Sequence, residues 1–132
     1  METGHAPLRA FLRQPATVEG MIKTVRQLKA ASLSVGVIAM IGVGGDRFAH
    51  GHVEDTLAIL KAMPPNRWDL AHLLDFIEMS GTPHRAAAEA RGIRSLSLAE
   101  RRAHAKALRA SLRAPGGEGS RVAPYALEAF VY

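Results

Sequence analysis

The spacing of apolar residues along the chain predicts two amphipathic helices. Apolar residues spaced three or four apart predict a helix over Val18–Ala31, with Thr17 as its N-cap. The same spacing predicts a second helix over Val53–Met63, which Pro64 and Pro65 end. The apolar positions of the two helices are Val18, Ile22, Val25, Leu28, Val53, Leu57, Leu60 and Met63.

Two apolar runs have the pattern of strands that are buried on both faces. The run Ser34–Val43 contains β-branched residues and ends in glycines, and the run Asp69–Met79 is also predicted to be a strand. Such runs are typical of parallel strands, and the helix predicted between them would form the crossover. We expect the two strands to be parallel neighbours. The side chains expected to be largely buried are Val37, Ile38, Ile41, Leu73 and Leu74.

Capping signals mark two further helices after the second strand. Thr82, followed by a proline, is the predicted N-cap of a short helix, and Gly92 suits its C-terminal cap. Ser97 and Glu100 have the spacing of a capping box, which opens a helix that runs to about Arg113. The predicted buried stripe of this last helix consists of Leu98, Ala105, Leu108 and Leu112.

The C-terminal part of the chain is predicted to be a loop and an extended tail. The loop is Ala114–Ser120, and Pro124 confines the tail Arg121–Tyr132 to a sheet edge. Helices and strands therefore alternate in an α/β fold, and 132 residues are about half of the roughly 250 that a complete (β/α) barrel needs. We divide the chain into a partial barrel, residues 1–113, and a loop with a C-terminal extension, residues 114–132.

The composition excludes several classes of function. The chain has no cysteine, which excludes disulfides, thiolate-bound zinc and an iron–sulfur cluster held by its own residues. Its longest apolar run, Val35–Val43, is much shorter than the about 20 residues that cross a bilayer. The first residues lack the apolar core of a signal peptide. We therefore expect a cytoplasmic protein that has no membrane segment, and its net charge of +5 is compatible with anionic partners.

Two polar segments after the first strand are candidates for ligand binding. The turn Gly42–Asp46 follows the carboxyl end of a predicted parallel strand, where free backbone N–H groups bind ligands. Its glycine spacing is not that of a dinucleotide fingerprint, and an ordinary turn explains it equally well. The segment Asp46–Asp55 contains imidazoles and carboxylates, but we favour a role in a polar loop and helix cap over a metal site.

Most of the positive charge lies in the segment Arg85–Arg113, which has eight Lys and Arg residues against two Glu. Four of these residues form a stripe along the last predicted helix. A phosphate backbone would fit along this stripe, but no aromatic residues are interleaved to stack on bases, so a solvated helix face is favoured. The basic stripe consists of Arg102, Lys106, Arg109 and Arg113.

Several segments, in this order, resemble the radical S-adenosylmethionine (radical SAM) enzymes. They are similar to the fourth, fifth and sixth strands of the family's barrel, the helices between these strands and a C-terminal extension of some members. The resemblance covers nearly the whole chain and implies a partial (half) (β/α) barrel that begins at the end of the fourth strand. The matching segments are Glu2–His5, Leu8–Leu12, Val18–Ala31, Ser34–Gly45, His52–Thr56, Asp75–Pro83, Ser120–Tyr125 and Phe130–Tyr132.

The resemblance implies a pocket for S-adenosylmethionine at the strand ends. In such enzymes the end of the fourth strand contacts the ribose or the methionine part, the fifth strand supports the adenine, and the sixth strand borders the same pocket. The family cleaves this cofactor reductively to a 5′-deoxyadenosyl radical, which abstracts hydrogen from a substrate. The implied cofactor-binding residues are Glu2, Thr3, Gly4, Ile38, Gly42, Gly44, Gly45 and Glu78.

The chain also departs from the family. A loop of three cysteines after the first strand holds the family's four-iron–four-sulfur cluster, and this chain contains neither the cysteines nor the first three strands. In addition, Ser32 stands where the resembling helix usually ends in glycine. We therefore expect the isolated chain to be inactive, and to associate with a complementary N-terminal half or with itself. The alternative is a small basic, non-catalytic half-barrel that binds a partner protein or a nucleic acid.

Overall fold

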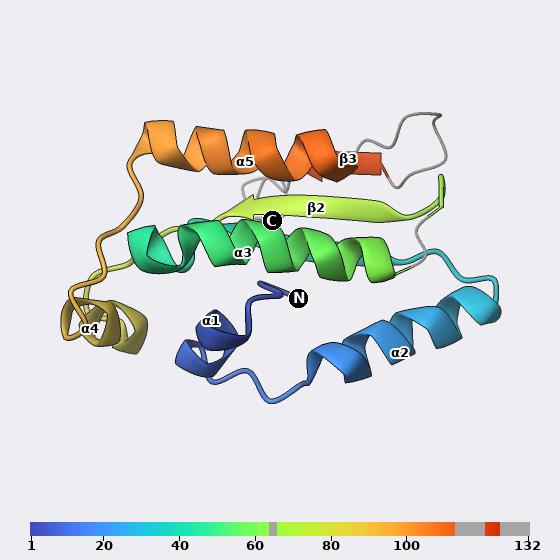
Figure 1. Cartoon of the computed structure of the whole chain (residues 1–132), viewed down its shortest axis with the longest axis horizontal. Coiled ribbons are helices and arrows are strands. Elements are labelled where there is room, and N and C mark those ends of the chain that lie inside the picture. Colours follow the sequence, from blue (N-terminus) through green and yellow to red (C-terminus); the bar gives the residue numbers. More distant parts are fainter. Residues whose placement is uncertain (64–65, 113–120, 125–132) are drawn as a thin grey trace, which may run out of the picture.

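A computed structural model describes residues 1–63, 66–112 and 121–124 of the chain (Figure 1). The loop predicted over Ala114–Ser120, the helix-ending Pro64 and Pro65, Arg113 and the tail from Tyr125 onward lie outside these described residues. Within them, no helix is both long enough and apolar enough to span a membrane. The elements are α1 (Ala6–Phe11), α2 (Val18–Ala30), β1 (Gly36–Ile41), α3 (Gly45–Ala62), β2 (Leu70–Asp75), α4 (Pro83–Glu89), α5 (Leu98–Leu112) and β3 (Arg121–Pro124).

The three strands form one parallel sheet in the order β1–β2–β3, which confirms the predicted α/β fold and the parallel pairing of the first two strands. The register of β1 and β2 runs from Gly36 opposite Leu70 to Ile41 opposite Asp75. β3 lies at an edge, as expected for the strand that ends in Pro124. A parallel sheet of this kind is compatible with part of a (β/α) barrel.

β1 and β2 are shorter than the apolar runs suggest. β1 ends at Ile41 because Gly42 takes a φ of +82°, which turns the backbone out of the extended conformation. The last bond of the ladder joins the N–H of Phe76 to the carbonyl of Ile41. The strand predicted to continue to Met79 therefore leaves the sheet after Asp75.

α3 begins at Gly45, eight residues before the predicted start at Val53. Gly51 lies inside the helix without interrupting it, and a Cβ at this position would overlap the ring of His5. His50 and His52 consequently lie well inside a helix, so the prediction that they belong to a loop or a first turn is wrong.

The capping residues are confirmed. The hydroxyl of Thr17 accepts the N–H of Gly20 at 3.0 Å, and Thr82 caps α4 in the same way. Ser97 and Glu100 exchange two hydrogen bonds, of 2.7 and 3.3 Å, as a capping box requires.

α2 ends in a residue with left-handed backbone conformation. Ser32 has a φ of +59° and donates its N–H to the carbonyl of Lys29. The N–H of Leu33 reaches back to the carbonyl of Leu28 at 3.0 Å, which completes a helix terminus that usually contains glycine. The serine that departs from the family pattern therefore occupies a position where glycine is favoured.

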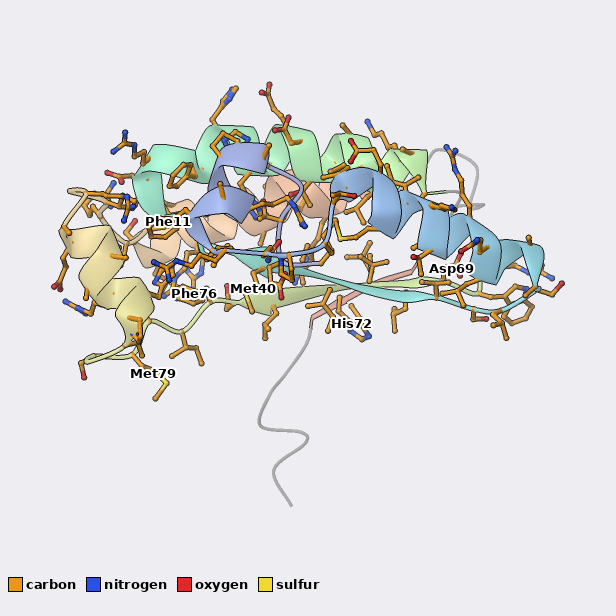
Figure 2. The ribbon with its side chains drawn as sticks, turned by 90° about the horizontal axis from the view of Figure 1, so that it is seen from below. Phe11, Met40, Asp69, His72, Phe76 and Met79 are labelled. Atoms are coloured by element: carbon orange, nitrogen blue, oxygen red, sulfur yellow. The ribbon has the colours of Figure 1, made fainter. Side chains whose placement is uncertain are left out.

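The helices of the described residues all lie on one face of the sheet, as Figures 1 and 2 show. Alternate strand residues, including Ile41 and Leu73, face α3 and α5 and are buried as predicted. The prediction that both faces are buried is wrong, because Ile38 and Leu74 point away from the helices and are half-buried. Val37 is also half-buried, at the margin of the core. The buried residues of the two core clusters are Ala39, Ile41, Ile59, Leu60, Met63, Ala71, Leu73 and Leu108.

The stripe that α5 buries differs from the predicted one. Leu98 is 55% exposed, because the first turn of α5 lies beyond the end of β1. Leu108 is buried as predicted and Ala105 is half-buried, whereas His104, which the predicted stripe did not include, is buried beside them. The side chain of Leu112 is outside the described part of the chain.

Candidate functional site

The N-terminal segment lies along the outer edge of β1. The carbonyl of Glu2 accepts the N–H of Met40 at 2.9 Å, and a carboxylate oxygen of Glu2 accepts a hydrogen bond from the side chain of Gln14. The N–H of Met40 points away from β2, so Glu2 occupies a position where another strand of the sheet would pair.

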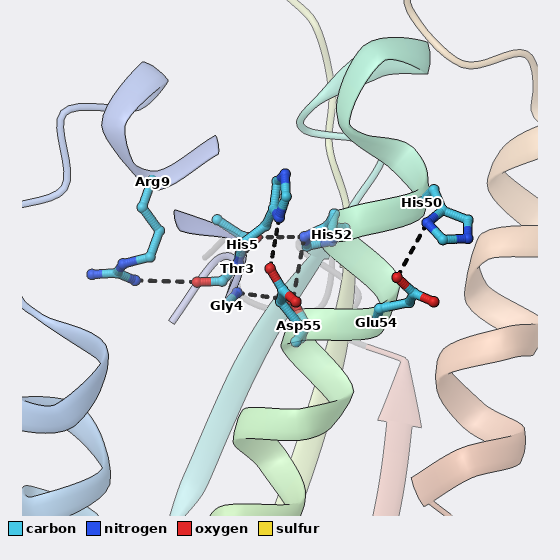
Figure 3. Close-up of polar contacts among 9 residues, drawn as sticks. Thr3, Gly4, His5, Arg9, His50, His52, Glu54 and Asp55 are labelled. Atoms are coloured by element: carbon cyan, nitrogen blue, oxygen red, sulfur yellow. Dashed lines mark hydrogen bonds and ion pairs between the residues drawn. The ribbon is translucent and has the colours of Figure 1, made fainter. Parts of the chain in front are cut away.

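Thr3 and His52 form a buried polar pair between this segment and α3 (Figure 3). The Nε2 of His52 lies 2.7 Å from the carbonyl of Met40, which only accepts, so Nε2 carries the proton. Nδ1 then accepts the hydroxyl of Thr3 at 2.6 Å. The hydroxyl of Thr56 lies 3.3 Å from Nδ1 and accepts the N–H of Gly4 at 2.9 Å. This network satisfies both nitrogens of a fully buried imidazole.

Burial keeps His52 uncharged. Loss of water around the ring lowers the pKa of His52 to about 4, and repulsion by His104 acts in the same direction. The hydrogen bond to the Met40 carbonyl opposes this shift. The ring of His104 stands edge-on to His52 with 4.8 Å between centroids, and burial lowers the pKa of His104 as well. Two neutral imidazoles therefore pack between α3 and α5 at neutral pH.

The structure gives Thr3 and Gly4 packing roles. Both residues are buried, and a Cβ on Gly4 would lie 2.7 Å from the carbonyl oxygen of Asp55. Sequence reasoning treated His52 as part of a capping loop and missed this network. Its sequence signal is the spacing of four residues between His52 and Thr56, which places both on one helix face.

The histidine and acidic side chains in the middle of α3 point in different directions (Figure 3). His50 pairs with Glu54 at 3.2 Å on the exposed surface, whereas Asp55 pairs with His5 at 2.7 Å. His52 points inward. Among the residues that the structure describes, no group of three or more His, Asp or Glu side chains is placed to hold a metal ion.

The glycine turn after β1 is packed against the chain itself. A Cβ on Gly44 would lie 2.8 Å from Cδ2 of Leu8, and a Cβ on Gly45 would lie 2.5 Å from the carbonyl oxygen of Arg94. Gly45 also has a positive φ of +57°. Close packing within the chain therefore accounts for these two glycines, and no ligand is needed to explain them. This agrees with the interpretation of the segment as an ordinary turn.

A cavity of about 310 Å³ lies next to this turn, at the carboxyl ends of β1 and β2. Ligands of open parallel sheets bind at this end of the strands, and pockets for small molecules have volumes of about 300–1,000 Å³. Phe11 and Phe76 line the cavity and lie together at the end of the sheet beside α4 (Figure 2). Gly42, Gly45 and Glu78 line it as well. The other residues that the resemblance implies, which do not line the cavity, are Glu2, Thr3, Gly4, Ile38 and Gly44.

Glu78 stands at the margin of the cavity with a side chain that is 22% exposed. Its carboxylate accepts the hydroxyl of Ser95 and lies 3.6 Å from a guanidinium nitrogen of Arg85. These contacts hold the carboxylate in place and put one cation beside it. Ile38, in contrast, lies on the sheet face that carries no helix.

The basic stripe lies on the exposed side of α5. Arg102, Lys106 and Arg109 are exposed, and none of them takes part in the ion pairs of the described residues. Its fourth member, Arg113, is outside those residues. The stripe is thus a solvated helix face, as the sequence favours.

Three comparisons with known proteins found no match to this chain: none with a protein-family model, none with a curated protein and none with a solved structure.

Proposed function

We propose that this chain is the C-terminal half of a radical SAM type (β/α) barrel and forms part of its S-adenosylmethionine pocket and substrate cavity. The observation that carries the proposal is the sheet face on which the described part of the chain has no helix. Ile38 is opposite His72 in the register, and Met40 is opposite Leu74, so a band of mostly apolar side chains lies on that face. In a (β/α) barrel this face points to the interior, where side chains of the remaining strands cover it.

The outer edge of β1 supports the same proposal. Glu2 already pairs with Met40 there, in the position of a preceding strand. Complementary strands would extend this pairing along the backbone of Gly36 and Ile38, which belongs to a strand at the edge of the described sheet.

The cofactor side of the site would be formed by residues that follow the strands. We assign Gly42, Gly45 and Glu78 to the wall of the S-adenosylmethionine pocket, because they border a cavity of ligand size at the end of the sheet where barrel enzymes have their active sites. The four-iron–four-sulfur cluster of the family does not fit this chain, which has no cysteine. A complementary half would have to hold the cluster, and we assign no reaction step to this chain alone.

The test is to express the chain together with the product of the reading frame directly upstream of its gene. We expect the two to copurify and, after anaerobic addition of iron and sulfide, to produce 5′-deoxyadenosine from S-adenosylmethionine. Leu74→Asp, on the open sheet face, should abolish copurification. Leu33→Asp, at an exposed residue outside the sheet, is the matched control and should not. An upstream product that has no three-cysteine loop, or that does not associate with the chain, would contradict the proposal.

The alternative is a non-catalytic half-barrel that binds a partner protein or a nucleic acid through its basic stripe. The exposed cations Arg102, Lys106 and Arg109 are the observation that favours it. Neutralisation of several phosphates would give RNA binding a steep dependence on salt. A gel shift with RNA that weakens strongly with salt, and that is lost when these three residues are replaced by Gln, would support the alternative.

A further inference from the structure

Arg101 lines the cavity at the strand ends, and no described residue neutralises it. Its Nε is buried without a hydrogen-bond partner in the described part of the chain, and none of the ion pairs there includes its guanidinium. The aliphatic part of Arg101 packs on Gly42, where a Cβ would lie 3.3 Å from its Cδ. Gly42 therefore lets the arginine lie close against the turn. Buried donors of this kind are normally matched by an acceptor.

The carboxylates near Arg101 are engaged by other arginines. Glu78 lies 3.6 Å from Arg85, and both carboxylate oxygens of Glu100 accept hydrogen bonds of 2.9 Å from Arg94. Arg101 is also the fourth residue of α5, near the positive end of the helix dipole, where a cation is disfavoured. The dipole and the guanidinium together favour an anion at this end of the cavity.

Another part of the cavity wall is aromatic. The ring of His84 lies between those of Phe11 and Phe76, with centroid distances of 5.4 and 4.7 Å. Nε2 of His84 donates to the carbonyl of Val43 at 3.1 Å, and its Nδ1 is buried without a hydrogen-bond partner among the described residues. A flat apolar group would pack against these rings.

From these contacts we propose that the cavity binds a planar, apolar ligand that carries an oxyanion, and that Arg101 binds this oxyanion. A guanidinium matches the paired oxygens of a carboxylate or a phosphate with two parallel hydrogen bonds. The proposal deepens the proposed function, because it defines the class of substrate that would occupy this cavity, while Gly42, Gly45 and Glu78 form the side of its wall that borders the S-adenosylmethionine pocket. The binding of the ligand is argued from the cavity alone, and only its role as a substrate rests on the proposed function.

Titration of the full ¹⁵N-labelled chain, followed by NMR, tests the binding of two anionic probes, benzoate and phenyl phosphate. We expect both to shift the amide signals of Phe76, His84 and Arg101 saturably, and the tighter of the two shows which oxyanion the site prefers. Arg101→Met should weaken their binding at least tenfold, while the neutral probe benzamide binds both proteins equally. Arg102→Met, at the exposed neighbour, is the matched control and should retain full affinity.

Three results would overturn the inference: no saturable shifts at the cavity, unchanged anion affinity in Arg101→Met, or an equal loss in Arg102→Met. If Arg101→Met does not fold, Arg101→Gln decides by the same criteria, because it keeps a polar head. Failure here is distinguishable from failure of the proposed function. The titration needs no partner half, whereas copurification does not depend on Arg101.

Discussion

The N–H of Met40, next to the carboxyl end of β1, donates a 2.9 Å hydrogen bond to the carbonyl of Glu2. This bond places Glu2 beside the outer edge of β1. The buried pair of Thr3 and His52 then fixes the segment against α3. In the described part of the chain, a residue of the N-terminal segment therefore pairs with the outer edge of β1. One face of the sheet beside it is not covered by helices.

The buried imidazole of His52 predicts that the protein loses stability in acid. An unfolded histidine has a pKa of about 6.5, whereas the pKa of folded His52 is about 4. Between these values the unfolded chain binds a proton that the folded chain does not, so stability falls as the pH drops from 6.5 to 4, by roughly 3 kcal/mol from this residue.

Urea unfolding at several pH values measures this effect. His52→Gln should lower stability at pH 7 and flatten the acid dependence, because it removes the titrating group. His50→Gln, on the exposed surface of the same helix, should leave the pH dependence unchanged. An acid dependence that is equally steep in His52→Gln would contradict the assignment.

Replacing Ser32 with glycine should stabilise the protein. Ser32 has a φ of +59°, a conformation that costs an ordinary residue about 1 kcal/mol more than glycine. We expect a gain of roughly 0.5–1 kcal/mol in the free energy of unfolding. Ala31→Gly, at the adjacent residue with a φ of −84°, should destabilise the helix end instead. If neither variant, or both variants, had a higher free energy of unfolding, the left-handed backbone conformation of Ser32 would not be a source of instability.

Gly45 should tolerate alanine less well than Gly92. Both residues have positive φ, of +57° and +63°, so both substitutions introduce backbone strain. Only at Gly45 would the new Cβ also overlap other atoms, at 2.5 Å from the carbonyl oxygen of Arg94. We expect Gly45→Ala to cost about 1–3 kcal/mol more than Gly92→Ala in thermal unfolding. Equal losses would mean that the turn relaxes and that its packing is not tight.

Anaerobic reconstitution of the isolated chain with iron and sulfide should give no stable cluster. The chain has no thiolate, and histidine and methionine do not assemble such clusters without cysteine. Absorption spectra after desalting and an iron determination measure the outcome. A stoichiometric iron–sulfur absorption band that survives desalting would contradict this prediction and the division of roles between two halves.

Local signals in the sequence predicted the order of the elements from α2 onward, whereas the short helix α1 was not predicted. The caps at Thr17, Thr82 and Ser97 were predictable because each uses a side chain that bonds to a backbone group at most three residues away. Parallel pairing followed from the apolar runs and the intervening helix. The start of α3 was not predictable from its polar residues. Gly51 suggested a loop there, whereas its lack of a side chain accommodates His5, which comes from a distant segment.

The candidate site depends on contacts that a single sequence does not display. The roles of Thr3 and His52 come from a hydrogen bond between residues 49 positions apart. Arg101 was counted among the cations of a basic segment, and only the fold places it at a cavity with Gly42 and Phe76. The apolar runs also suggested two buried sheet faces, since an uncovered face with apolar side chains has the same sequence pattern as a covered one.

Static light scattering on the dilute purified chain tests the central claim, that this is half of a barrel, most directly. The open sheet face and the edge of β1 predict self-association in the absence of a complementary half. We expect a mass above that of the 14.2 kDa monomer, which Leu74→Asp on the open face reduces and Leu33→Asp does not. A sharp monomer peak together with cooperative thermal unfolding would contradict the claim and show that the chain is a self-sufficient small domain.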